Sequence, residues 1–202
     1  MMKLITILIV CLLVACSTKI STRYYSLHAL PEPSTTINLP ANTTFGIGSV
    51  KLPSMLNRKG IVTHKVGSAV QVASHDVWAG RLKEDFIRVV AELMAQGLGI
   101  NDVVTEPWNT RFRPQYQLQL DVHQFSGQIG GLVRFKVNWT LIGDYGKEKL
   151  MSRTDDITLQ TEDDSYQSYV STLSALLDAF SKQAIRTDIV NEINKHSENN
   201  IN

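Results

Sequence analysis

The sequence predicts an α+β fold, in which a single domain carries an antiparallel-rich mixed sheet with two amphipathic helices packed on one face. The chain has 202 residues, of which 43% are hydrophobic and 19% charged, as in one folded domain. Apolar and polar residues alternate over much of Tyr116–Leu159, as in strands that bury one face. Two other segments repeat apolar residues at helical spacing.

Short strands are expected before the first helix. They are separated by a proline-rich linker and end in a hairpin whose turn is Gly67-Ser68. The expected segments are a strand at Arg23–Leu27, the linker Pro31–Pro40, a strand at Thr44–Lys51, and Gly60–Val66 paired with Ala69–Ala73.

An amphipathic helix should follow. Ser74 or Asp76 is the expected cap, and Trp78 begins an apolar stripe that ends near Gly97 or Gly99. After a short strand at 102–105, three strands form an antiparallel meander: 116–123, with a bulge at Gln124-Phe125, then 133–141 and 150–159.

The last helix should begin at a cap supplied by Asp163 or Asp164. Its apolar stripe runs from Tyr166 to Ala184, and the helix frays through Ile193. We expect the folded domain to occupy 23–194 and the polar residues 195–202 to form a disordered tail.

The first residues have the pattern of a signal peptide. Lys3 precedes an apolar run from Leu4 to Ala15, which as a helix spans only ~18 Å of the ~30 Å bilayer core. The run ends in Leu13-Val14-Ala15-Cys16, which resembles the bacterial lipobox. A thiol is needed for acylation, and a small residue is needed before the cut. We therefore predict that residues 1–15 are removed and that Cys16 is acylated.

Acylation of Cys16 would fix the protein to a membrane, because several acyl chains together bind almost irreversibly. Ser17, rather than Asp, follows the cysteine, and by resemblance to lipoprotein sorting this implies the outer membrane, on its periplasmic face. Residues 16–22 are a polar tether. From Cys16 to Tyr24 the chain reaches at most ~28 Å, so the folded body should sit close to the membrane.

Composition and motifs disfavour several other functions. A net charge of +1 lacks the basic excess of a nucleic-acid binder, and two cysteines make neither a disulfide scaffold nor a four-cysteine zinc site. Common hydrolase, nucleotide-binding and zinc-protease motifs are absent. His64, His75 and Asp76 could approach one another, but structural roles are favoured. We predict no catalytic residue, metal or cofactor.

Two irregular segments combine apolar and basic residues, and both are candidate partner-binding surfaces. Pro53–Lys59 contains Arg58 and Lys59. Pro107–Arg113 contains Trp108, Arg111 and Phe112. Trp108 follows a proline and precedes polar residues, so it fits the predicted core less well than the other tryptophans do.

Several blocks occur in a characteristic order after the lipobox. They are Tyr24-Tyr25-Ser26-Leu27, the segment from Val50 to Val62, Trp78-Ala79-Gly80-Arg81-Leu82, Phe125 before a glycine turn that leads to Trp139-Thr140-Leu141, and Asp164-Ser165-Tyr166. Together they resemble the ABC-type transport auxiliary lipoproteins, the group that includes the paraquat-inducible lipoproteins. The resemblance extends from about Tyr24 to Ile185.

The resemblance implies an accessory role in MCE-type lipid transport between the two membranes. The lipoprotein would dock a periplasm-spanning MCE-domain protein at the outer membrane and support envelope integrity, without catalytic residues of its own. Homo-oligomerisation is left open. Two alternatives are a lipoprotein activator or scaffold of a cell-wall synthase, which the short tether disfavours, and an envelope hydrolase, for which no nucleophile–base pair is found.

Overall fold

The computed structural model describes residues 21–30, 37, 39–65, 67, 69–108 and 112–199. The signal peptide, Cys16 and most of the tether lie outside the described residues, as do most of the linker Pro31–Pro40 and Arg111. Within the described part, no helix combines the length and the apolar character needed to span a bilayer.

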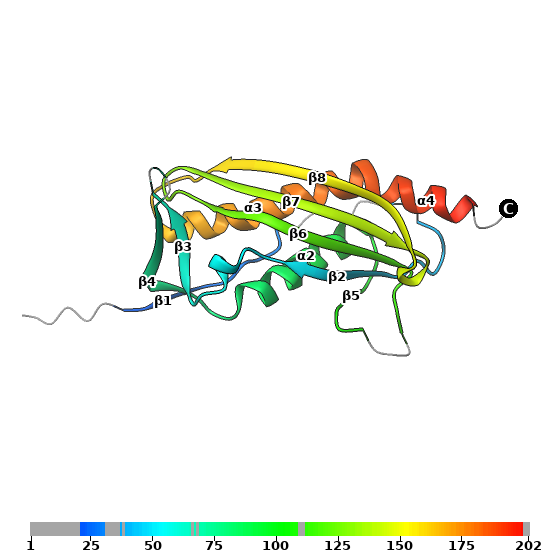
Figure 1. Ribbon diagram of the computed structural model, residues 1–202, viewed down its shortest axis with the longest axis horizontal. Coiled ribbons are helices and arrows are strands. Elements are labelled where there is room, and N and C mark those ends of the chain that lie inside the picture. Colours follow the sequence, from blue (N-terminus) through cyan, green and yellow to red (C-terminus); the bar gives the residue numbers. More distant parts are fainter. Residues whose placement is uncertain are drawn as a thin grey trace, which may run out of the picture.

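The predicted α+β class is confirmed, with the strands divided between two sheets. The small sheet has the order β1-β4-β3, and the large sheet has the order β5-β2-β6-β7-β8 (Figure 1). The strands of the small sheet are β1 (Arg23–Tyr25), β3 (Gly60–His64) and β4 (Val70–Trp78). Those of the large sheet are β2 (Phe45–Lys51), β5 (Val103–Thr105), β6 (Tyr116–Gly127), β7 (Leu132–Gly143) and β8 (Glu148–Gln160).

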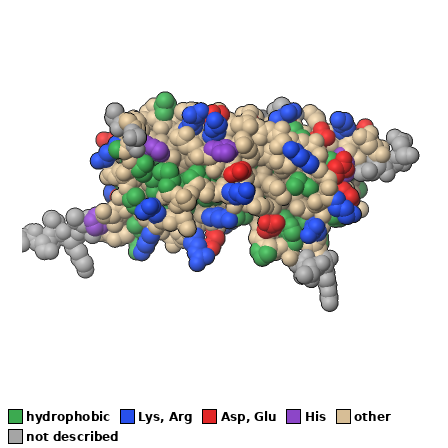
Figure 2. Space-filling view, in the orientation of Figure 1, with side chains coloured by type: hydrophobic (Ala, Val, Ile, Leu, Met, Phe, Trp, Pro, Cys, Tyr) green, Lys and Arg blue, Asp and Glu red, His purple; other side chains and the backbone are tan. Residues whose placement is uncertain are grey.

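Helices cover one face of the large sheet. They are α2 (Leu82–Leu98), α3 (Tyr166–Ala184) and α4 (Val190–Asn199), with a π-helical turn at Ile185–Ile189 between the last two. Short 3₁₀ turns occur at η1 (Ser54–Leu56) and η2 (Asp144–Gly146). The face of the molecule seen in Figure 2 carries lysine, arginine, acidic and histidine side chains, in keeping with a sheet that is wet on its helix-free side.

The meander is confirmed, because β6, β7 and β8 pair antiparallel. The register shift falls between Val122 and Gln124, just before the predicted bulge, since Gln124 and Phe125 pair regularly with β7. Its inward side chains meet those of α2 and α3 in an aromatic cluster. Phe135 lies at the centre, with ring centroids 5.5 Å from Phe125, 5.4 Å from Phe180 and 6.0 Å from Phe86. The contacts with Phe125 and Phe180 are edge-on and the contact with Phe86 is tilted, and such ring pairs add to the free energy gained by burying the rings.

The predicted start of the first helix is wrong. Residues Ser74 to Trp78 continue strand β4, and α2 begins at Leu82 without a side-chain cap. The Trp78 backbone N–H donates to the carbonyl of Lys59 in the adjoining chain (2.9 Å), so the segment is held in the sheet. The predicted end is confirmed, because Gly99 adopts the left-handed conformation (φ 66°).

The C-terminal expectations also need correction. Ser165, rather than Asp163 or Asp164, caps α3, because its hydroxyl accepts a hydrogen bond from the Ser168 N–H (3.1 Å). The expected disordered tail at 195–202 is instead helical through Asn199. Ile193 is fully buried, and buried His196 lies 3.1 Å from the Tyr116 hydroxyl, so packing against β6 holds this polar segment in place.

Tyr169 joins the two sheets. Its buried hydroxyl donates to the Val62 carbonyl of β3 and accepts from the Gly127 N–H of β6, both at 3.0 Å. Burial raises the pKa of Tyr169 well above its usual value, so the phenol stays protonated and keeps its donor role. The small sheet is thereby fixed at one end of the large one.

Candidate docking surfaces

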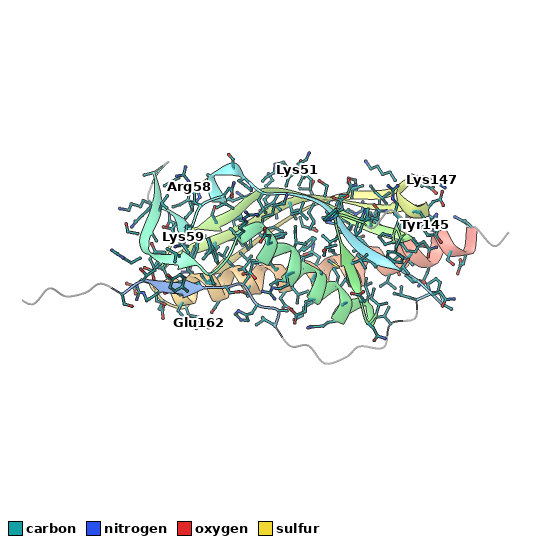
Figure 3. The ribbon with its side chains drawn as sticks, turned by 90° about the horizontal axis from the view of Figure 1, so that it is seen from below. Lys51, Arg58, Lys59, Tyr145, Lys147 and Glu162 are labelled. Atoms are coloured by element: carbon teal, nitrogen blue, oxygen red, sulfur yellow. The ribbon has the colours of Figure 1, made fainter. Side chains whose placement is uncertain are left out.

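The first candidate segment, Pro53–Lys59, is a rigid turn with exposed basic side chains. Leu56 is buried and holds η1 against the core, while the Arg58 Nε–H donates to the Met55 carbonyl at 3.2 Å. Both Arg58 and Lys59 are exposed. Figure 3 shows them beside the small sheet, with Lys51 farther along the same side of the molecule. The turn therefore offers two preformed cationic groups.

The second segment places Trp108 against β2. The nearest atom of its indole ring lies only 2.7 Å from the position that a Cβ atom on Gly46 would take. The corresponding distance for Gly48 is 3.9 Å. A side chain at Gly46 would collide with Trp108 and Pro114, so this glycine makes room for the ring, whereas the tightest neighbour of a side chain at Gly48 would be Gln119, at 3.3 Å. Gly46-Ile47-Gly48 is thus part of a strand, as the sequence favoured, with the register shift after Ile47.

Trp108 is half-buried, so it is neither a fully buried core residue nor a fully exposed binding residue. Its ring also lines an open groove of about 440 Å³ together with Ser49, Lys83 and Ile87. Phe112, farther along the same segment, is exposed. The groove adjoins the last residues of β2, which β5 leaves unpaired because it pairs with only Phe45–Ile47 of that strand.

The two candidate segments do not form one continuous surface around their named residues. Trp108 covers the Gly46 end of β2, whereas Arg58 and Lys59 follow the opposite end of that strand, beyond Lys51. A partner that contacts both must extend along β2. Which loops neighbour each other could not be read from the sequence, because β5, and with it the Trp108 segment, meets β2 only through long-range parallel pairing.

Of the three residues considered for metal binding, Asp76 and His64 have structural partners, and His75 is exposed. The Asp76 carboxylate accepts from the Arg23 guanidinium, at 2.8 Å from Nε, and from the Tyr25 hydroxyl at 2.9 Å. His64 Nε2 lies 2.9 Å from the Ser126 hydroxyl. No group of three potential metal ligands occurs among the residues that the structure describes.

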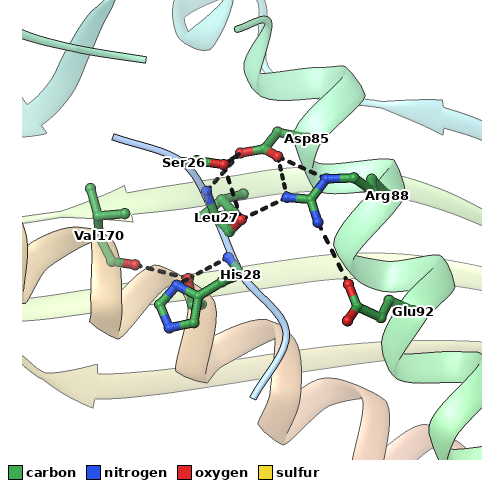
Figure 4. Close-up of polar contacts among 8 residues, drawn as sticks. Ser26, Leu27, His28, Asp85, Arg88, Glu92 and Val170 are labelled. Carbon is green, nitrogen blue, oxygen red and sulfur yellow. Dashed lines mark hydrogen bonds and ion pairs between the residues drawn. The ribbon is translucent and has the colours of Figure 1, made fainter. Parts of the chain in front are cut away.

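The segment after β1 is clamped between two helices, a feature that helical periodicity alone did not reveal. Asp85 of α2 accepts hydrogen bonds from the Leu27 N–H (2.6 Å) and the Ser26 hydroxyl (3.0 Å), as Figure 4 shows. Arg88 donates to the Leu27 carbonyl at 2.7 Å. Ser174 of α3 accepts from the His28 N–H at 3.3 Å. The start of the folded domain is therefore tied firmly to the helical layer.

We expect Asp85→Ala to lower the free energy of unfolding by about 1.5–3 kcal/mol, because it leaves the buried Leu27 amide without its charged acceptor. Glu84→Ala is the matched control: Glu84 is the exposed neighbour on the same helical turn, and its pair with Arg81 contributes little. Urea unfolding of both variants measures the difference. Equal stabilities would contradict the role of the clamp.

Comparison with known proteins identifies the family. The sequence model of the family described as ABC-type transport auxiliary lipoprotein component matches residues 25–184. The chain belongs to this family. It is thus a member of a lipoprotein family associated with transport, as the sequence blocks indicated.

Solved structures support the fold. A crystal structure of an uncharacterized protein has a TM-score of 0.68 at 20% identity and covers 82% of this chain and 97% of its own. Protein XCC0632 from Xanthomonas campestris has a TM-score of 0.67 at 14% identity, covering 87% and 99%. No match was found among the curated proteins.

Proposed function

We propose that this protein is a non-catalytic lipoprotein of the outer membrane that docks the periplasm-spanning component of an MCE-type lipid transport system. The family match over 25–184 is the observation that carries the proposal, because it makes the chain an auxiliary component of transport. The lipobox ending in Cys16, followed by Ser17, supports an outer-membrane anchor facing the periplasm. Docking such a partner would support envelope integrity.

The architecture suits a docking role. Mixed sheets backed by helices form a rigid support, and the basic turn and the Trp108 segment present side chains of types that often dominate binding energy. Arg58 and Lys59 are exposed, and no described ion pair engages them. A partner with carboxylates near an aromatic or apolar group would complement these two segments.

We expect Arg58→Ala with Lys59→Ala to weaken binding of the purified MCE-domain partner by about tenfold or more while the melting temperature stays unchanged, because both side chains are exposed. Lys147→Ala with Lys149→Ala is the control, since it removes another exposed basic pair. The affinity of each variant for the immobilised MCE-domain partner measures both effects. An equal loss from the two pairs would indicate general charge attraction and contradict a defined surface.

Trp108→Ala tests the second segment in the same assay. We expect about 30-fold weaker binding if the ring is central to the interface, and a stability loss smaller than that of a core aromatic, because the ring is only half-buried. Wild-type affinity in a folded Trp108→Ala variant would remove this segment from the docking surface.

A further inference from the structure

Several of the exposed large hydrophobic side chains lie at the end of the molecule where the folded chain begins. Among the described residues, the large hydrophobic side chains that are exposed are Tyr24 (62% exposed), Val70 (47%), Val72 (42%), Phe112 (44%), Leu132 (58%) and Tyr145 (50%). Tyr24, Val70 and Val72 belong to the small sheet, and Leu132 begins β7 next to it. Figure 1 shows that β1, β4 and the turn between β6 and β7 lie at the same end.

The hairpin of β3 and β4 and the turn between β6 and β7 are close neighbours at this end. His64 of the hairpin contacts Ser126 of β6, and a cavity of about 570 Å³ opens between Lys65, Gln71 and Ile129. The cavity walls thus come from both elements.

The position of the chain start decides what this end faces. Arg23 and Tyr25 are bound to the buried carboxylate of Asp76, and β1 pairs in parallel with β4. The start of the folded domain is therefore fixed at the edge of the small sheet. From Cys16 to Arg23 the chain can extend at most ~25 Å, so this end of the body is held near the membrane.

We propose that this end face, formed by Tyr24, Val70, Val72 and Leu132, rests on the phospholipid surface and inserts its apolar side chains into the interface. Tyrosine and aliphatic side chains are suited to the boundary between headgroups and acyl chains. The inference rests on the proposed acylation of Cys16, which brings the face to the bilayer. It adds a contact of the protein body with lipid, separate from the acyl chains themselves.

Apolar contact, rather than charge, is the driving force expected here. Asp76 is neutralised by Arg23, and Asp164 lies against Gly130 in the turn beside Leu132. Exposed Lys59 and Lys65 flank β3 at the same end, but phosphatidylcholine carries no net charge to attract them. Zwitterionic phosphatidylcholine should therefore suffice, and the contact should change little with salt.

The processed chain allows a direct test, because its one cysteine, Cys16, is the predicted acylation site. Single cysteines are introduced as Val72→Cys or Leu132→Cys at the end face, and as Phe112→Cys or Tyr145→Cys as equally exposed controls. Each is labelled with an environment-sensitive fluorophore on the acylated protein in phosphatidylcholine vesicles. Some vesicles contain lipids with a nitroxide near the headgroup. Melting temperatures check that each variant is folded.

We expect the emission maximum of the fluorophores at positions 72 and 132 to shift to shorter wavelength when the protein binds vesicles. Nitroxide lipid should quench at least half of their emission, while the fluorophores at 112 and 145 show neither effect. Equal quenching at all four positions, or none at 72 and 132 on vesicle-bound protein, would overturn the inference and leave the anchor intact. A wavelength shift without quenching would indicate that protein covers the face, and would overturn it too. Protein that fails to bind vesicles would overturn the anchor and this inference together.

Discussion

Cys16→Ser should abolish outer-membrane fractionation and leave an unprocessed or soluble protein. Without the thiol no diacylglyceryl group can be added, so the chain loses its predicted lipid anchor. The exposed apolar end face alone would give only weak, reversible binding, whereas acyl chains contribute about 0.8 kcal/mol for each buried CH₂. Fractionation of envelopes followed by immunoblotting measures the effect.

Ser17→Asp is the informative companion to that variant. It preserves the cysteine and should retain the acylated protein in the inner membrane if the host follows the common sorting rule. A Cys16→Ser protein that still fractionates with the outer membrane would contradict the lipobox interpretation. Unchanged location of Ser17→Asp would place the sorting signal elsewhere.

Phe135→Ala should cause the largest loss of stability among the substitutions considered. Phe135 is fully buried and contacts the rings of Phe86, Phe125 and Phe180, so truncation removes packing from both the sheet and the helices. Buried phenylalanine truncations cost about 3–5 kcal/mol, which corresponds to a fall in melting temperature of about 10 °C for a domain of this size.

Leu132→Ala is the control for the core substitution, because Leu132 lies on the same strand but is exposed. We expect its melting temperature to stay within about 2 °C of the wild type, as for surface substitutions in general. Calorimetry of both variants checks the difference. Similar melting temperatures for the two would contradict the central position of Phe135 in the core.

Local patterns predicted the elements whose determinants are local. Alternation identified β6 and β7 and an irregularity close to the observed register shift, and Gly99 ended α2 as expected. Trp78 was misplaced because its spacing to Leu82 also suits a helix. What keeps it in a strand is long-range, namely the pairing of β4 with β1 and β3.

The C-terminal segment shows the same limit. Its sequence is polar enough to suggest disorder, yet His196 reaches both the Tyr116 hydroxyl and Glu148, on strands far away in the chain. Of the proposed functional features, the lipobox is readable because its chemistry depends on consecutive residues. The relation of Trp108 to Gly46 and Gly48 is not, because nothing in either segment indicates that they meet.

The most direct test of the docking proposal is the identification of proteins that co-purify with the acylated protein from cross-linked envelopes. The tagged wild-type protein should recover an MCE-domain protein, and the Arg58→Ala, Lys59→Ala variant should recover markedly less of it at equal abundance and location. Recovery of a cell-wall synthase without any MCE-domain protein would contradict the account and favour an activator or scaffold of that complex.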